Sequence, residues 1–269
     1  MTISDRLEKF NKEFEEARSQ LKSFIFRVTA SAADTEDILQ DTYIRASEKL
    51  DTFKGESSLK TWFFSIASNL AKDHLRSRKR WPLNAMDLAR EESLKNPDVH
   101  ISRFLEIHRT SPHGEFELRE HINVCFTCIG KMLPLEQQLV VLLKEIFEFK
   151  IKEIASIIDR TEGVVKHALF NARKTMEEIF EQRCSLINKN GACHQCSELN
   201  GLFNPRQVFQ EQKLKTGLEN DMGNKTRDQL FELRTRIAKA VNPYECSGAD
   251  LHFFHFDHIN NVLKSGSSE

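Results

Sequence analysis

Residues 151–176 read IKEIASIIDRTEGVVKHALFNARKTM and contain two short helical patterns separated by a tight break. Apolar side chains recur at helical spacing on both sides of the break, which spans residues 159–163. Two helices joined by so short a turn, with Thr161 as the expected N-cap of the second, are typical of a helix-turn-helix. The exposed face expected for the second helix is polar and basic, like helices that enter the DNA major groove: Glu162, Val164, Lys166, His167, Phe170, Asn171, Arg173 and Lys174. A solvated helix of an ordinary all-α domain has the same pattern, so this segment alone leaves both interpretations open.

Three longer helices are expected nearer the N-terminus, over residues 10–28, 33–50 and 59–80. The second begins with a strongly acidic turn, and the third follows a turn-forming stretch that ends in two N-cap candidates, Ser57 and Ser58. The third helix closes with RSRKR at residues 76–80, a basic surface that suits phosphates but that the helix dipole alone also favours. Trp62 and Phe63 on this helix would suit the stacking of unpaired bases, although their spacing favours the protein core.

The composition fits a mostly helical protein of about two domains. Of the 269 residues, 39% are hydrophobic, and only 10 are Gly and 6 are Pro. Lys plus Arg (39) nearly balance Asp plus Glu (40), so net charge alone does not indicate a nucleic-acid-binding protein. No apolar run reaches the ~18 residues of a membrane span, and the N-terminal MTISDRLEK lacks the apolar core of a secretory signal. The expected location is therefore the cytoplasm.

Breaks in the helical pattern divide the chain into four segments. Trp81-Pro82 ends the third helix, and Pro97, Pro112 and Gly114 fall in a stretch without a sustained apolar period. Helical patterns resume near residue 115 and lead into the helix-turn-helix. We therefore expect a first domain at residues 1–81, a flexible linker at 82–114, a helix-turn-helix domain at 115–180 and a small, mostly helical C-terminal extension at 181–269.

Two sets of motifs resemble the bacterial extracytoplasmic-function (ECF) sigma factors of the sigma-70 superfamily. The motifs ADTEDILQDTY (33–43), FKG (53–55) and TWFFSIASN (61–69), followed by Asp73 and Arg76, resemble region two of that family. LP (133–134), EQQ (136–138), KEIA (152–155) and GVVK (163–166) resemble region four. The resemblance covers about residues 10–180. It implies an all-α promoter-recognition subunit of RNA polymerase that has no enzymatic activity of its own.

The resemblance also implies which residues bind the two main partners, core RNA polymerase and promoter DNA. The acidic face of the second helix would bind the polymerase through Asp34, Asp37, Gln40 and Asp41. The loop at 53–58 would hold a flipped base of the minus-ten element. Promoter contacts would come from Phe53, Lys54, Lys60, Asn69, Lys72, Arg76, Arg78 and Arg80 in region two and from Thr161, Glu162, Lys166, His167, Phe170, Arg173 and Lys174 in region four. An anti-sigma factor is a further partner that the family allows.

Region four departs from the family pattern at four positions. Where the family usually has Thr, Ser-Arg and a further Arg, this chain has Val164, His167, Ala168 and Asn171. Two expected basic contacts are missing, which leaves the affinity for the minus-thirty-five element open, whereas Lys166 and Arg173 remain.

Paired cysteines indicate a metal or thiol site. Cys193 and Cys196 have the C-x-x-C spacing with which two thiolates hold a tetrahedral ion, Cys184 lies close by in the sequence, and Cys125 and Cys128 form a second pair. Four thiolates from the two pairs would close a zinc site, with Cys184 as a spare thiol; no other cofactor is expected. The alternatives are simple burial of Cys125 and Cys128 and a reversible disulfide between Cys193 and Cys196. The roles of His252, His255 and His258 stay open.

Two other classes of protein compete with the sigma factor. A stand-alone helix-turn-helix regulator would explain residues 151–176 but not the acidic second helix or the basic third helix. A thiol oxidoreductase would use Cys193 and Cys196, but it normally places such a pair beside a βαβ pattern, which the sequence lacks.

Overall fold

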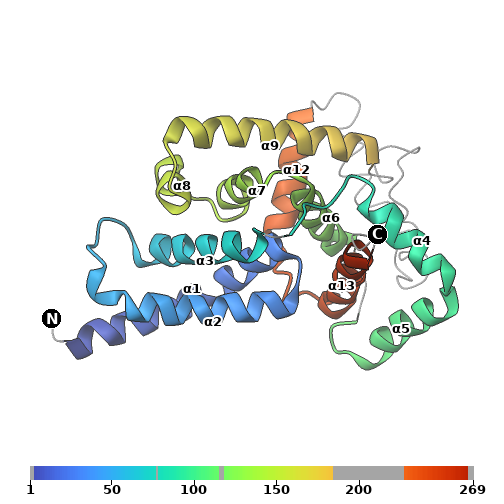
Figure 1. The fold of residues 1–269 in the computed structure, drawn as a ribbon, viewed down its shortest axis with the longest axis horizontal. Helices are drawn as coiled ribbons and strands as arrows, with labels where there is room; N and C mark the ends of the chain where they lie inside the picture. Colours follow the sequence, from blue (N-terminus) through green and yellow to red (C-terminus); the bar gives the residue numbers. More distant parts are fainter. Residues whose placement is uncertain (1–2, 77, 115–117, 184–226, 266–269) are drawn as a thin grey trace. The chain divides into compact units, whose positions relative to one another are not determined.

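The computed structural model describes residues 3–76, 78–114, 118–183 and 227–265 (Figure 1). These described residues contain helices and no strand, which confirms the predicted all-α class. They form two compact units, and each unit combines two separate stretches of the chain. The first unit is Met1–Arg80 with Leu133–Ala172, and the second is Trp81–Met132 with Arg173–Glu269. The predicted domain boundaries remain a prediction, because this grouping follows contacts rather than family regions.

The first unit begins with three helices that pack on one another, α1 (Ile3–Thr29), α2 (Ala32–Glu48) and α3 (Leu59–Leu75), with a short 3₁₀ turn, η1 (Leu50–Thr52), between the last two. Their shared core is aromatic: the Phe63 ring lies edge-on to Phe10 and Phe14, at centroid distances of 5.5 and 5.1 Å. Of the two expected caps, Ser58 is the N-cap of α3, and its Oγ accepts a hydrogen bond from the Thr61 N–H at 3.1 Å.

Helix α3 ends at Leu75, five residues before the end expected from the sequence. Arg76 and Arg80 would lie one above the other on a continued helix, and like charges at that spacing destabilise it. Arg78 and Arg80 are instead held by other parts of the first unit, as described below.

The second part of the first unit contains the predicted helix-turn-helix. It consists of α7 (Leu135–Val141), a π-helical turn η2 (Leu142–Ile146), α8 (Ile151–Ile158) and the beginning of α9 (Glu162–Arg183). Asp159 ends α8 in the left-handed region (φ 55°), and this sharp reversal directs the chain into α9. The Thr161 Oγ1 accepts a hydrogen bond from the Val164 N–H at 3.4 Å, as expected of an N-cap.

The two parts of the first unit share a core. The Phe64 ring of α3 packs against Phe147 and Phe149, at centroid distances of 5.4 and 4.9 Å. Gln138 of α7 is fully buried, and its Nε2 donates to the Arg27 carbonyl oxygen of α1 at 2.8 Å. Helices α1 and α3 therefore pack directly on the helix-turn-helix segment.

The second unit contains α4 (Ala85–Lys95), α5 (Pro97–Thr110), α6 (Leu118–Met132), α12 (Arg227–Lys239) and α13 (Ala249–Ser265). The stretch 82–114, for which the sequence predicts a flexible linker, contains α4 and α5. Phe104 of α5 is buried and packs against Leu251 and Phe254 of α13. Such packing stabilises helices whose own pattern is weak. Helix α13 also packs on α4, and α12 packs on α6.

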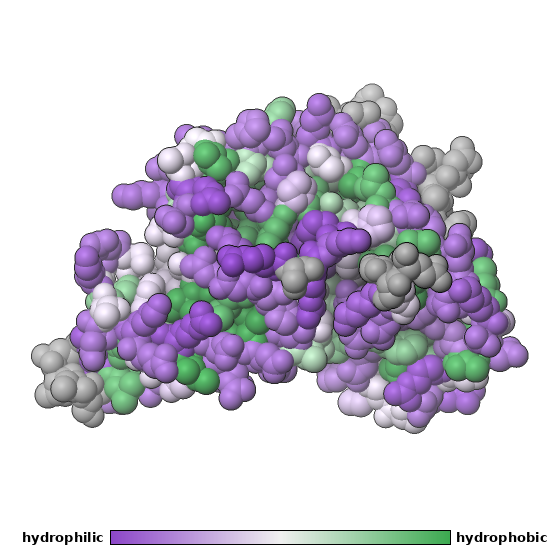
Figure 2. All heavy atoms as spheres, in the orientation of Figure 1, coloured by the Kyte–Doolittle hydropathy of each residue, from purple (hydrophilic) through white to green (hydrophobic). Residues whose placement is uncertain are grey.

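Most residues on the face seen in Figure 2 are hydrophilic. No helix in the described ranges is both long and apolar enough to cross a bilayer.

Candidate nucleic-acid interface

Helix α9 presents the polar and basic face that the sequence predicts. Val165, Ala168 and Ala172 are buried on one side, while the ring of Phe170 is 66% exposed on the other. The remaining predicted contact residues are also exposed: Thr161, Glu162, Lys166, His167, Arg173 and Lys174. An exposed aromatic ring among lysines and an arginine can contact both the apolar and the charged parts of DNA.

Of the predicted DNA contacts on α3, some are exposed to solvent and others form hydrogen bonds with protein groups. Asn69 and Arg76 are exposed, and Arg76 pairs with Asp73 at 3.2 Å. Lys72 is half-buried, and its Nζ donates to the Ile158 carbonyl oxygen at 3.2 Å. Burial lowers the pKa of Lys72, and the nearby positive charge of Arg160 lowers it further. Lys72 is thus held by the helix-turn-helix rather than by solvent.

Arg80 is held in the same way. Its Nε donates to the Leu133 carbonyl oxygen and its Nη2 to Gln138 Oε1, both at 2.6 Å. Burial lowers the pKa of Arg80 to about 10. A guanidinium at neutral pH remains charged, so the two oxygens solvate a positive charge in place of water.

The residues predicted to capture a flipped base lie in the loop between α2 and α3. Phe53 is half-buried with its ring 4.8 Å from that of Trp62, and its carbonyl oxygen accepts from Arg6 at 3.4 Å. Lys54 is exposed, and Gly55 adopts a positive φ of 74° that favours glycine. Lys60 lies over the Phe149 ring, 5.4 Å from its centroid. Trp62 is half-buried, so it is neither fully in the core nor a free stacking platform.

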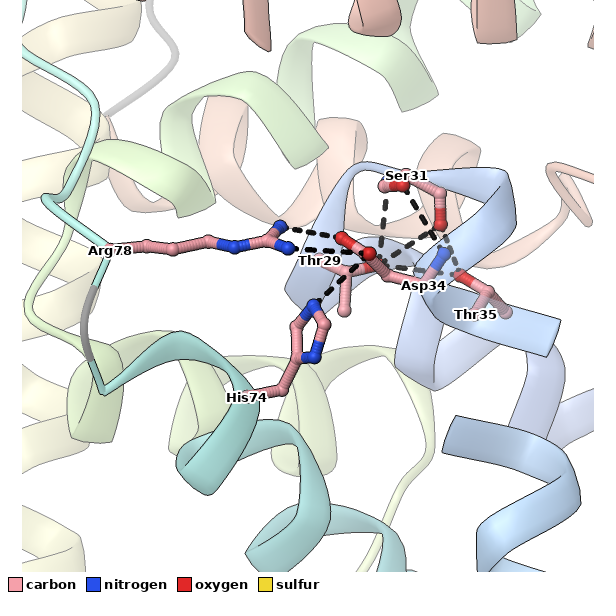
Figure 3. A network of polar contacts seen from close by, with 6 residues as sticks. All are labelled: Thr29, Ser31, Asp34, Thr35, His74 and Arg78. Atoms are coloured by element: carbon pink, nitrogen blue, oxygen red, sulfur yellow. Dashed lines mark hydrogen bonds and ion pairs between the residues drawn. The ribbon is translucent and has the colours of Figure 1, made fainter. Parts of the chain in front are cut away.

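One residue of the acidic face of α2, Asp34, forms ion pairs within the first unit (Figure 3). The Asp34 carboxylate accepts from Arg78 Nη1 at 2.5 Å and Nη2 at 3.3 Å, and it pairs with His74 at 3.1 Å. Burial alone would raise the pKa of Asp34, but hydrogen bonds from Arg78 and His74 outweigh burial, and the pKa is lowered. Asp37, Gln40 and Asp41 are exposed and remain available to a basic partner.

Of the predicted metal ligands, the structure describes only two. Cys125 is half-buried and Cys128 buried on α6, whereas Cys184, Cys193 and Cys196 lie outside the described residues. The four-thiolate site therefore stays a prediction.

Sequence reasoning missed a different cluster of donor atoms in the second unit. Glu120, Cys246 and His252 are all buried, and one ligand atom from each lies within 4.8 Å of the others. Burial and then the Glu120 carboxylate raise the pKa of Cys246 to about 12, while burial lowers that of His252 to about 3. Neither Glu120 nor Cys246 belongs to a recognisable sequence motif, because their proximity depends on the fold.

The other two histidines singled out in α13 have different surroundings. His255 is buried, and His258 Nε2 lies 2.9 Å from both the Ser93 hydroxyl and the Ala89 carbonyl oxygen of α4. His258 therefore joins α13 to α4 within the second unit.

Comparison with known proteins matches two parts of the chain to family models. Residues 14–80 match sigma-70 region 2, and residues 125–176 match sigma-70 region 4. The first match contains α2, α3 and most of α1; the second contains the helix-turn-helix. The predicted region-two and region-four motifs lie within these ranges.

Individual relatives agree with the family models. The ECF RNA polymerase sigma-E factor of Haemophilus influenzae is 29% identical over 147 residues, which cover 55% of this chain and 75% of that protein. The ECF RNA polymerase sigma factor SigG of Mycobacterium tuberculosis is 28% identical over 181 residues, which cover 63% of this chain and 48% of that protein. A solved structure of the sigma factor RpoE with the anti-sigma factor NepR, from Bartonella quintana, has a TM-score of 0.46 and 22% identity, covering 65% of this chain and 98% of that chain.

Proposed function

This chain belongs to the ECF sigma factors of the sigma-70 family, and we propose from that membership that it binds core RNA polymerase and directs it to specific promoters. The observation that carries the proposal is the order of two matched regions, region 2 at residues 14–80 and region 4 at residues 125–176. A stand-alone DNA-binding regulator needs only a helix-turn-helix. Region 2, with its acidic α2 and basic α3, is the part such a regulator would lack.

Each region contributes a surface to the proposed function. The exposed residues Asp37, Gln40 and Asp41 on α2 would bind a basic surface of the polymerase. The exposed face of α9 would contact the upstream promoter element, with Lys166 and Arg173 on phosphates. The α2–α3 loop would hold an unpaired base of the downstream element. Catalysis would belong to the polymerase.

Several side chains that we propose as DNA contacts are bonded to protein groups of the first unit. Lys72 and Arg80 of region 2 donate to backbone or side-chain oxygens of region 4, and Arg78 pairs with Asp34. Binding of the melted strand would need these cations to exchange protein partners for phosphates. We therefore propose that polymerase binding separates region 2 from region 4, and that the arrangement described above is the polymerase-free form.

Regulation by thiols and by a partner protein also belongs to this proposal. Cys125, Cys128, Cys193 and Cys196 would hold zinc, with Cys184 as an exchanging thiol, and an anti-sigma factor would be a further partner. Replacing Cys193 and Cys196 by Ser should alter metal content or the response of transcription to oxidants. If both stay unchanged, these thiols have no regulatory role.

Run-off transcription tests the function directly. Core RNA polymerase is supplied with genomic promoter fragments, with and without the full chain. Specific transcripts that form only in its presence support the sigma factor. Tight binding of the chain alone to duplex DNA, without new transcripts, would instead indicate a stand-alone regulator.

A further inference from the structure

The second unit contains a buried set of mixed sulfur, nitrogen and oxygen donors that the sigma-factor function does not use. Glu120 belongs to α6, Cys246 to the turn before α13, and His252 to the first turns of α13. All three are buried, with exposures of 8% for Glu120 and Cys246 and 4% for His252. We propose that these three side chains hold a divalent transition-metal ion of the zinc class.

The distances fit such an ion. Cys246 Sγ lies 3.9 Å from His252 Nδ1, and the three ligand atoms lie within 4.8 Å of one another. In a tetrahedral zinc site, bonds of about 2.3 Å to sulfur and about 2.0 Å to nitrogen place those two atoms about 3.5 Å apart. Small side-chain rotations are enough to bring the donors into a coordination sphere.

The charges of the Cys246 thiolate and the Glu120 carboxylate also suit a divalent ion. A thiolate and a carboxylate together carry two negative charges, which are costly to bury without a cation. A divalent ion cancels both, while His252 binds as a neutral imidazole. The thiol proton of Cys246 leaves to solvent as the metal–sulfur bond forms, so the assembled site is neutral.

Glu120 is already oriented by a second layer of hydrogen bonds. Its Oε1 accepts the Ser247 N–H and its Oε2 accepts the Gly248 N–H, both at 2.8 Å. A carboxylate has about four lone-pair sites, so both oxygens keep capacity for a metal. Ligating carboxylates in proteins are commonly fixed in this way.

A further donor lies on the same helix. His255 is buried one helical turn after His252, and its Nε2 has no hydrogen-bond partner among the described residues. His255 is not part of the cluster formed by Glu120, Cys246 and His252, so the fourth coordination position is left to water. The ion would tie α6 to the beginning of α13, so its role would be structural.

The test measures metal binding in the full chain and does not depend on the proposed transcriptional role. Because Cys125, Cys128, Cys184, Cys193 and Cys196 could bind metal themselves, all five are first replaced by Ser. The metal-free protein is then titrated with Co²⁺ without oxygen, and the thiolate-to-cobalt absorption band is followed. We expect about one Co²⁺ per chain with a single-thiolate band, and zinc should displace it.

Two matched variants locate the sulfur ligand. In the same background, Cys246→Ala should abolish the band, whereas Thr127→Ala, which removes a buried hydroxyl from α6 outside the proposed site, should leave it. His252→Gln should weaken Co²⁺ binding by more than about 100-fold. Absence of the band in the background protein, or a band that survives Cys246→Ala, would overturn the proposal.

A second measurement covers the case in which Cys246→Ala does not fold. X-ray absorption of the zinc-loaded background protein should show one sulfur ligand with nitrogen or oxygen ligands in the remaining positions. Coordination without sulfur, or by two or more sulfurs, would rule out this site. The result is independent of any transcription assay.

Discussion

The Nζ of Lys72 donates a hydrogen bond to the backbone carbonyl oxygen of Ile158, 3.2 Å away. Lys72 lies on α3 of region 2, and Ile158 is the last residue of α8, the first helix of the helix-turn-helix. A side chain proposed to bind the melted promoter strand is therefore engaged with the segment proposed to bind upstream DNA. The first unit can use this lysine on DNA only after that hydrogen bond breaks.

Gln138→Ala should destabilise the packing of region 2 on region 4. Gln138 is fully buried between Arg27, to whose carbonyl oxygen it donates, and Arg80, from which it accepts. Its loss leaves the buried Arg27 carbonyl oxygen and the half-buried Arg80 guanidinium without this partner, and we expect the free energy of unfolding to fall by about 1–3 kcal/mol. Denaturant unfolding measures the change. The half-buried neighbour provides the control: Gln137→Ala should cost no more than about 0.5 kcal/mol, and equal losses would contradict the assigned role.

Asp34 should make the stability of the first unit depend on pH. Its folded pKa lies below the ordinary value of 3.8, so its contribution is complete above that value and is lost as the pH falls through the folded pKa. Asp34→Asn should therefore remove part of the loss of stability between about pH 5 and pH 2, measured by denaturant unfolding at each pH. Asp37→Asn removes the same charge from the same helix but keeps the Arg78 ion pair. Identical pH profiles for the two variants would show that the ion pair has no such effect.

Ser58→Ala should destabilise α3 by about 0.5–2 kcal/mol, because it removes the acceptor for the Thr61 N–H. Thermal unfolding and the helical circular-dichroism signal report the loss. Ser57→Ala is the matched control, since Ser57 precedes the cap and its hydroxyl donates to the Ser58 carbonyl oxygen at 3.4 Å and does not accept from an N–H of α3. The idea fails if Ser57→Ala costs as much as Ser58→Ala.

Lys166→Ala should weaken the binding of the polymerase complex to its promoters about equally for all sequences. The exposed Lys166 on α9 is proposed to neutralise one phosphate, so its loss should reduce the slope of log affinity against log salt by about 1. Filter binding or fluorescence anisotropy over a salt series measures the slope. Lys264→Ala removes an exposed lysine from α13 and should leave the slope unchanged. A slope that is the same for wild type and Lys166→Ala would exclude the phosphate contact.

Local patterns in the sequence were enough to predict the helices of the first unit and the helix-turn-helix. Apolar spacing placed α1, α2 and α3, and Thr161 caps α9 as expected. Features that depend on distant contacts were not predictable. Helix α5 forms because Phe104 meets α13 about 150 residues later, and Gln138 is an ordinary polar residue until Arg27 and Arg80 surround it. The donors Glu120 and Cys246 likewise meet only after α6 and α13 have packed.

The interleaving of the two units also has a consequence for biosynthesis. On the ribosome, α1 to α3 emerge first, and the side of Phe64 that packs against Phe147 and Phe149 stays uncovered until those residues have been translated. Helices α4 and α5 must then wait for α13, which ends at residue 265. A nascent chain therefore carries two incomplete units at the same time, each with apolar surface exposed. Closure of the second unit, unlike that of a domain encoded by one continuous stretch, must await the synthesis of α13.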